Sequence, residues 1–323
     1  MPDDAPMTAD AGYSPEVTAA GPARLLFDRA WSGTVLPVII VSAAIIALWY
    51  VAAIWMNAPF QRDIYARADT AFSTSDLVKA TLSQERPVLP APHQVMQEID
   101  KTVFRTNVTS KRSLVHHAGI TLSSTLLGFL MGTVLGIALS VGIIHSRALD
   151  RSLMPWIITS QTIPILAIAP MIIVVLNAIG ISGLLPKAII SAYLSFFPVA
   201  VGMVKGLRSP DLMHLDLMRT YNASRSQVFW KLRWPSAMPF LFATMKVAIS
   251  MSLVGAIIGE LPTGAVAGLG ARLLAGSYYG QTIQIWSALF TAAILAAVLV
   301  MIVGFAHSYV LKCMGQKPDG AAA

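Results

Sequence analysis

Two charged side chains of this sequence stand within or at the edge of long apolar stretches. Lys246 and Glu260 are separated by thirteen residues that carry no charge. Ionisable groups at membrane depth are costly and indicate functional roles, such as lining a path for a polar solute. For Lys246 a second interpretation is open, because its long side chain can reach back to lipid headgroups. For Glu260, a solvated position in an external loop is the alternative to a position on the path.

The residues after Glu260 are rich in turn formers. The stretch 262–280 contains five glycines, including Gly268 and Gly270. Irregular backbone near a membrane is tolerated where it is buried in protein or lines a water-filled cavity. The stretch is therefore a candidate for the external gate of a translocation path. The alternative is a plain external loop beside an interfacial belt of three aromatic residues, which are Tyr278, Tyr279 and Trp286.

Other chemistry is poorly supported by the residues present. The single cysteine, Cys313, cannot form an internal disulfide, and the six histidines show no metal-ligand spacing. His116 and His117 are expected to be interfacial polar residues at the start of a helix. The sequence has no phosphate-binding G-x-x-x-x-G-K-[ST] motif and no Ser, His and Asp arrangement in a catalytic context. ATP, if it drives this protein, must be bound by another chain.

A charged, amphipathic segment, 205–235, separates two apolar runs and is typical of a docking surface for a soluble partner. Its pattern predicts a short helix at about 210–221, a bend at Asn222 and a second helix to Trp230, pinned by Pro235 and Pro239 at the base of the fifth span. Such a rigid elbow can transmit displacement. The alternative is a basic loop that rests on anionic headgroups, since it holds Lys205, Arg208, Arg219, Arg225, Lys231 and Arg233.

These residues must be positioned by membrane-spanning helices. Hydrophobic residues make up 55% of the 323 and charged residues only 12%, about half the charged share of a typical soluble domain. Five uncharged windows are long enough for helices that cross the hydrocarbon, and strands that alternate as in a barrel are missing from the pattern. We therefore predict an all-α, polytopic membrane protein with about six transmembrane helices, at roughly 34–56, 118–144, 153–176, 184–204, 237–258 and 284–311.

The same pattern predicts the organisation of the chain. Residues 1–33 read as a flexible cytoplasmic tail, 34–56 as an uncleaved first transmembrane helix, 57–113 as an extracytoplasmic segment, 114–312 as the core, and 313–323 as a cytoplasmic tail. An exposed turn is expected at 177–183. Basic residues gather in 205–233, in the loop after the second helix and at the C-terminus, so both termini are expected in the cytoplasm. The net charge of +7 then belongs to inside-facing loops and not to a nucleic-acid surface.

The order of several motifs resembles the permease subunit of a type I ABC importer, of the nitrate, sulfonate and taurine type. The resemblance extends over about 89–274. The family signature runs E-A-A, three residues, Gly, nine residues, an aliphatic residue, one residue and Leu-Pro. The similar positions in this sequence are Asp216-Leu217-Met218, Asn222, Leu232 and Trp234-Pro235, and every spacing is kept. Ala223-Ser224, Lys246, Glu260 and Gly268-Leu269-Gly270 also match. Further matches are Leu89-Pro90-Ala91-Pro92, Thr121-Leu122, Leu127-Gly128-Phe129, Pro164, Ala167, Pro170, Phe196-Phe197-Pro198 and Gly206.

The resemblance implies a type I ABC importer permease fold and a set of partners. These are cytoplasmic ABC ATPase subunits that bind the ATP, a second permease subunit in a homodimer, an extracytoplasmic substrate-binding protein and the bilayer of the bacterial inner membrane, with no cofactor in this chain. It implies a small polar or anionic nutrient, nitrate-, sulfonate- or taurine-like, or pyrimidine- or vitamin-like. It assigns coupling to the ATPase to Asp216, Leu217, Met218, Arg219, Asn222, Ala223, Ser224, Leu232 and Pro235.

Two other classes of function are weaker. An ion-coupled secondary transporter normally has intramembrane carboxylates or broken helices in matching halves, and the predicted spans contain no aspartate. A membrane-embedded enzyme would need a cofactor or metal arrangement that the sequence does not offer. The sequence therefore predicts a non-enzymatic transporter subunit.

Overall fold

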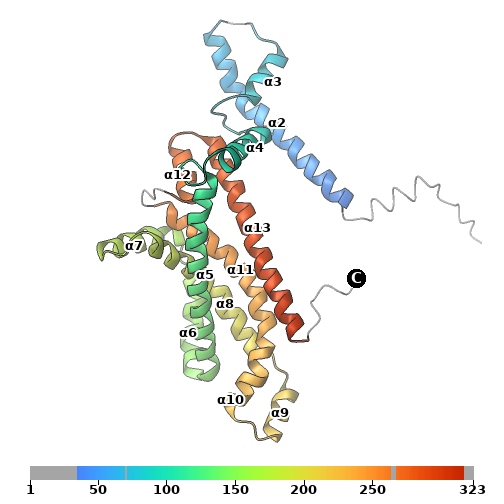
Figure 1. The fold of residues 1–323 in the computed structure, drawn as a ribbon, viewed down its shortest axis with the longest axis vertical. Coiled ribbons are helices and arrows are strands. Elements are labelled where there is room, and N and C mark those ends of the chain that lie inside the picture. The colour runs from blue at the N-terminus through green and yellow to red at the C-terminus, as the bar shows by residue number, and fades with distance from the viewer. Residues whose placement is uncertain (1–34, 70, 263–266, 316–323) are drawn as a thin grey trace, which may run out of the picture. The chain divides into compact units, whose positions relative to one another are not determined.

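The computed structural model describes residues 35–69, 71–262 and 267–315, in which all regular structure is helical (Figure 1). The predicted N-terminal tail and most of the predicted C-terminal tail lie outside these residues. The chain divides into two units, 1–52 and 53–323. The first unit contributes only the beginning of helix α2 (Val35–Arg67) to the description. The second unit contains every other helix.

Six short helical segments accompany the long helices, and one of them, α10, begins the candidate span 225–260. They are α3 (Thr74–Leu82), α4 (Pro92–Asp100), the π-helical turn η1 (Lys101–Arg105), α9 (Leu212–Thr220), α10 (Arg225–Val228) and α12 (Leu269–Tyr278).

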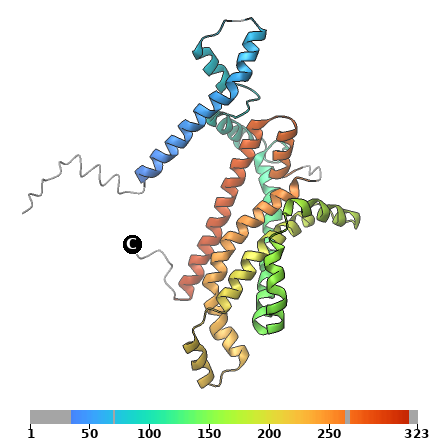
Figure 2. The same cartoon turned by 180° about the vertical axis from the view of Figure 1, so that it is seen from behind.

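The long helices of the second unit are α5 (Leu114–His145), α8 (Leu184–Leu207), α11 (Trp234–Glu260) and α13 (Thr282–Cys313). Helix α8 packs against both α5 and α11, and α13 packs along α11 (Figures 1 and 2). A second π-helical turn, η2 (Phe229–Arg233), joins α10 to α11.

Five helices, including α2, are long and apolar enough to cross a membrane, and a bent pair, α6 (Arg147–Ser160) with α7 (Ile165–Ala178), makes a sixth if the two count as one span. The prediction of an all-α protein with about six spans is confirmed. The predicted first helix, 34–56, is longer than expected, because α2 continues to Arg67.

The predicted single helix 153–176 is wrong. The structure has α6 and α7 there, bent by 100° at a break of four residues or fewer. Pro164, at the break, lacks an N–H and restricts Ile163 to extended conformations. The carbonyl of Ser160, which the broken helix leaves free at the end of α6, accepts a hydrogen bond from the hydroxyl of Tyr193 on α8. The bend is thus held by the neighbouring span.

Close packing of α5 on α8 depends on small residues one turn apart. A β-carbon on Gly128 would lie 2.1 Å from the β-carbon of Ser191, and one on Gly132 would lie 2.1 Å from Oγ of Ser195. Helix association within a bilayer relies on such close contacts, since lipid is as apolar as the helix surfaces. The hydroxyl of Ser140 adds an interhelical bond of 2.9 Å to the carbonyl of Ala200.

The segment predicted to be extracytoplasmic is held to α2 by one buried amide. Nδ2 of Asn57, on α2, donates to the carbonyl of Leu89 at 2.9 Å, and its Oδ1 accepts from the N–H of Val88 at 2.7 Å. Asn57 is 1% exposed, so its polar atoms depend on these partners. The bonds hold the residues just before α4, which is where the Leu-Pro-Ala-Pro motif lies.

Candidate functional site

The segment 208–233, which we call the elbow, has the bent shape that its sequence predicts. Helix α9 begins after Asp211, whose Oδ1 accepts from the N–H of Leu212 at 2.9 Å. It ends before Asn222, which has φ +51°, and the N–H of Ala223 then bonds to the carbonyl of Met218 at 3.0 Å. Asparagine enters the left-handed region more readily than most residues. The predicted helix and the bend at Asn222 are confirmed.

The second arm of the elbow starts with a reciprocal cap. The N–H of Ser224 donates to Oε1 of Gln227 at 2.8 Å, and the N–H of Gln227 donates to Oγ of Ser224 at 3.3 Å. This capping box starts α10. From Arg225 the helical chain continues without interruption through η2 and α11 to Glu260. The elbow is therefore one end of a transmembrane helix.

The predicted end of the second helix at Trp230 is wrong, because the helical chain continues into α11. Pro235 and Pro239 lie within this continuous stretch, where each lacks the N–H of a regular helical hydrogen bond. The wider π-helical turn η2 comes immediately before Pro235 and is the kind of local adjustment that accommodates such a residue. Within η2, Phe229 is buried in a cluster with Leu207, Ala237 and Leu241, which anchors the arm to the spans.

Helix α9 presents an apolar ridge to solvent. Met213, Leu217 and Tyr221 follow one another at intervals of four residues and are 80%, 52% and 76% exposed. Residues at this spacing share a helix face, and α9 has no buried residue at all. A contiguous exposed apolar surface of this kind indicates an interaction site. We call these three residues the ridge.

The predicted coupling residues divide between the tip and the base of the elbow. Asp216 and Arg219 form an exposed ion pair of 2.8 Å on α9. Leu217, Asn222 and Ser224 are also exposed, whereas four others are half-buried at or below the bend: Met218, Ala223, Leu232 and Pro235. The exposed group presents the largest accessible surface to a partner, and the half-buried residues are partly accessible beside it.

One contact at the elbow was not foreseen from the sequence. Arg208, at the end of α8, pairs with Asp150 on α6 at 2.8 Å. The pair links the bent helices α6 and α7 to the start of the elbow. The sequence held one signal for this ion pair, because Asp150 is a lone carboxylate between Arg147 and Arg151 in a stretch otherwise predicted to be basic.

At the other end of α11, Glu260 is wholly buried and binds the start of α12. Its Oε2 accepts from the N–H of Gly270 at 2.8 Å. Both of its oxygens lie 3.0 Å from Oγ1 of Thr121 on α5, which donates its hydroxyl proton to the carboxylate. The solvated external position considered for Glu260 is therefore wrong. The side chain of Glu260 therefore caps α12 by accepting a backbone N–H at the start of that helix.

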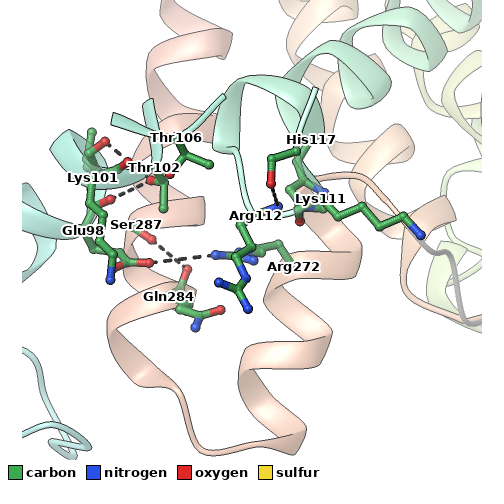
Figure 3. A network of polar contacts seen from close by, with 12 residues as sticks. Glu98, Lys101, Thr102, Thr106, Lys111, Arg112, His117, Arg272, Gln284 and Ser287 are labelled. Atoms are coloured by element: carbon green, nitrogen blue, oxygen red, sulfur yellow. Dashed lines mark hydrogen bonds and ion pairs between the residues drawn. The ribbon is translucent and has the colours of Figure 1, made fainter. Parts of the chain in front are cut away.

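Two further side chains complete this arrangement, which we call the clamp. The N–H of Leu269 donates to Oγ1 of Thr121 at 2.9 Å, and the N–H of Gly268 donates to Nδ1 of His117 at 2.9 Å. Since Nδ1 accepts, Nε2 carries the hydrogen and donates to the carbonyl of Lys111 at 2.9 Å (Figure 3). Three consecutive backbone N–H groups are thus satisfied by three buried side chains.

The prediction that His117 is an interfacial residue is wrong, because it is 4% exposed and is part of the clamp. Thr121 was recognised only within a sequence match, without a role. His117 and Thr121 are four residues apart on α5, so they face the same way. That spacing was visible in the sequence, but their partners lie about 150 residues away along the chain.

The two glycines of the Gly268-Leu269-Gly270 motif have a steric explanation. Gly268 has φ +132°, and a β-carbon there would lie 2.2 Å from the carboxylate carbon of Glu260. A β-carbon on Gly270 would lie 2.3 Å from the carbonyl oxygen of Ile257. Side chains at these positions would push α12 away from the end of α11. Both glycines are buried, so the clamp needs them for close approach.

Lys246 belongs to neither the elbow nor the clamp. It is half-buried on α11, and its Cε lies 3.8 Å from the position a β-carbon on Gly304 of α13 would take. At 1.5 Å per residue it is about 18 Å along the helix from Trp234 and about 21 Å from Glu260. The residues predicted to line a path therefore lie at two separate positions. Lys246 is in the middle of α11, whereas Glu260, Gly268 and Gly270 are at the clamp.

Comparisons with known proteins agree with this architecture. The chain is 31% identical to the formylaminopyrimidine transport permease protein ThiX of Halalkalibacterium halodurans, across 193 residues that make up 60% of this chain and 72% of the relative. It is 26% identical to the nitrate import permease protein NrtB of Synechocystis, across 69% of this chain and 77% of the relative. A chain of the MetNI methionine ABC transporter, solved in inward-facing conformations, superposes with a TM-score of 0.52 at 19% identity, covering 62% of this chain and 95% of that one, and supports the fold.

The family match covers the chain from within α5 to the end of α13, and so includes the elbow, α11 and α12. Residues 127–314 match the family described as "Binding-protein-dependent transport system inner membrane component". The resemblance drawn from the signature around Asn222 is confirmed, and so is the prediction of a non-enzymatic transport protein. This multi-pass membrane protein belongs to the family of inner-membrane permease components of binding-protein-dependent ABC transporters.

Proposed function

We propose that this chain forms, with a second copy of itself, the membrane path of an ATP-driven importer, and that the elbow receives a separate cytoplasmic ATPase subunit. The ridge carries the proposal, because Met213, Leu217 and Tyr221 expose apolar surface at the end of a helix that continues into the membrane. ATP is bound by the partner, and this chain holds no cofactor. An extracytoplasmic binding protein delivers the solute.

The continuity of α11 supports a mechanical role. One uninterrupted helical stretch, Arg225–Glu260, has the elbow's second arm at one end and Glu260 at the other. A displacement of the elbow is therefore passed to the carboxylate that holds the start of α12. We infer that α12 forms part of the external gate, with Glu260, Gly268 and Gly270 positioning it and Lys246 lining the path; residues 263–266 of the predicted gate lie outside the described residues.

The proposed orientation places the elbow and both termini in the cytoplasm of a bacterial cell, with the chain in the inner membrane. The basic residues of the elbow favour this side. Relatives are named for nitrate and for a formylaminopyrimidine, and a small polar or anionic nutrient is the substrate class we propose. A positively charged Lys246 within the path would favour an anion.

The test of the docking role compares two substitutions on α9. Leu217→Glu puts a charge on the ridge, and a desolvated charge in an interface costs several kcal/mol. Leu212→Glu makes the same change at a residue that is 75% exposed but lies on another face of the helix, where an acidic residue at the N-terminus is benign. We expect Leu217→Glu to abolish co-purification of the ATPase subunit and Leu212→Glu to retain it.

Ala223→Glu is a second probe, placed at the inside of the bend. Loss of ATPase binding with normal membrane insertion is the expected result, and it is read out as permease amount in membranes together with ATPase bound per permease. If Leu217→Glu and Ala223→Glu both leave assembly and transport-stimulated ATP hydrolysis unchanged, the elbow is not the docking element.

A further inference from the structure

A polar cavity of about 820 Å³ lies beside the clamp, on the side of α12 that faces the segment before α5. Its walls come from α4 and η1, from the loop that leads to α5, from α12, and from the start of α13. Figure 3 shows Arg112 and Arg272 extending into the same space as Gln284. The remaining polar lining residues are Glu98, Lys101, Thr102, Arg105, Thr106, Asn107, Ser110, Tyr279 and Gln281.

Positive charge is in excess around this cavity. Arg105 is matched by a close ion pair of 2.7 Å with Asp100. Arg272 is only 14% exposed, yet its nearest carboxylate oxygen, on Glu98, is 3.8 Å away. Charge-assisted hydrogen bonds between such groups are normally about 2.7–2.9 Å long. The Glu98 contact therefore leaves much of the hydrogen-bonding capacity of Arg272 unused.

Two arginines that line the cavity, Arg112 and Arg272, have hydrogen-bonding capacity that is not used within the described residues. Nε of Arg272 is buried and has no hydrogen-bond partner among the described residues. Arg112 makes no ion pair within the described part of the chain, and Lys101 lines the cavity nearby. Burial lowers the pKa of Arg272 from its ordinary value, Glu98 opposes this, and Arg112 lowers it further. Two guanidinium groups that repel one another at an enclosed polar surface are typical of an anion site.

We propose that this cavity binds a small oxyanion, held by the guanidinium groups of Arg112 and Arg272 with Lys101 contributing charge at the rim. Guanidinium donors match the oxygens of sulfate, phosphate and phosphodiester groups. Gln284 offers an amide N–H to the same ligand. The occupant is a free oxyanion of the external medium or the phosphate of a lipid headgroup, since both present the same chemistry.

The bound anion would tie two parts of the external face together. Arg112 belongs to the loop that leads into α5, whereas Arg272 lies two residues after Gly270 of the clamp. An anion between them bridges the extracytoplasmic segment to α12. The site thus stands beside the proposed path and acts on the position of α12, independently of which solute is transported.

Binding is measured on the full chain purified in lipid-free detergent, by equilibrium dialysis against radiolabelled sulfate and phosphate at constant ionic strength. We expect saturable binding that weakens about tenfold or more in Arg112→Gln and in Arg272→Gln, as the loss of a charged hydrogen bond implies. Lys79→Gln is the matched control. It removes one positive charge from an exposed position in the same extracytoplasmic segment but outside the cavity.

Glu98→Gln separates an anion site from a merely structural ion pair. Removing this carboxylate frees Arg272 and takes away repulsion, so anion binding should tighten. Arg112→Gln provides a readout that does not depend on the Glu98 contact, because Arg112 is exposed and can be replaced without unfolding the chain.

The alternative occupant, a lipid headgroup phosphate, is tested with the chain in nanodiscs. In that case the chain binds no inorganic anion in detergent, and phosphatidylglycerol stabilises it against unfolding more than phosphatidylcholine does. Arg112→Gln removes that difference between the two lipids. The proposal is overturned if the chain shows neither saturable anion binding nor stabilisation by phosphatidylglycerol. It is also overturned if these effects have the same size in Arg112→Gln, in Lys79→Gln and in the unaltered chain.

Discussion

The carboxylate of Glu260 and the backbone N–H of Gly270 are joined by a hydrogen bond of 2.8 Å inside the protein, although Glu260 ends one helix and Gly270 begins another. The bond makes the last residue of α11 the cap of α12. Because α11 is continuous with the elbow, this single contact connects the proposed ATPase side of the molecule to the proposed external gate.

Glu260→Gln should destabilise the protein while keeping the size of the side chain. The amide group places a donor where the carboxylate offers an acceptor to Gly270 or Thr121, and it removes the negative charge at the start of α12. We expect a loss of about 1–3 kcal/mol in the free energy of unfolding, seen as a lower midpoint of thermal unfolding in detergent. Asp63→Asn, at an exposed carboxylate, should stay within about 0.5 kcal/mol. Equal midpoints for the two variants would contradict the clamp.

Gly268→Ala tests the close approach of α12 to α11. Gly280 provides the control, because it too has a positive φ, +64°, but a β-carbon there meets nothing within 4 Å. Gly280→Ala should cost about 1 kcal/mol through backbone strain alone. Gly268→Ala adds a clash with the carboxylate of Glu260, so its folded yield and thermal midpoint should be clearly lower. If the two variants unfold alike, Glu260 does not hold α12 as described.

The elbow could be predicted from the sequence because its determinants are local. Asn222 follows a short amphipathic helix, and only a few residue types take the left-handed conformation that a sharp bend requires. The position of Phe229 as a buried anchor was not predictable. It depends on Leu207 and Leu241, which come from other elements, and on a π-helical turn that has no clear local signature.

The clamp could not be assembled from the sequence for the same reason. Glu260 was recognised as unusual, but its partner Thr121 is 139 residues away, and a single sequence gives no pairing between them. The bend between α6 and α7 was missed because an uncharged window predicts a span whether or not it is broken. Pro164 was noted, yet prolines also occur within continuous helices of this protein, as Pro198 and Pro239 show.

Asn222 offers a test of the elbow's shape. Asn222→Gly should preserve ATPase binding, since glycine adopts positive φ freely. Asn222→Val should reduce it, because a β-branched residue in the left-handed region costs about 1–2 kcal/mol and the bend would open. ATPase co-purified per permease is the measurement, with permease content of the membranes as control. Equal binding by the Gly and Val variants would mean that the bend is not needed for docking.

The predicted orientation can be tested with the single cysteine. Cys313 is exposed at the end of α13, so a membrane-impermeant thiol reagent should label it in inside-out vesicles and not in intact spheroplasts. Replacing it by serine and introducing Ser75→Cys, at an exposed position of the segment predicted to be extracytoplasmic, should reverse the pattern. Labelling of Cys313 from outside would overturn the proposed topology.

Lys246 is the remaining residue of the proposed path, and its two possible roles predict different results. If its side chain only reaches lipid headgroups, replacing it should leave uptake unchanged. We expect Lys246→Met to lower the rate of anion uptake several-fold without lowering the yield of assembled complex, and Lys246→Arg to retain most of the rate. Lys312→Met is the control, because it also removes one positive charge, at an exposed lysine near the end of α13. It should leave the rate of uptake unchanged. Unchanged uptake in Lys246→Met would exclude it from the path.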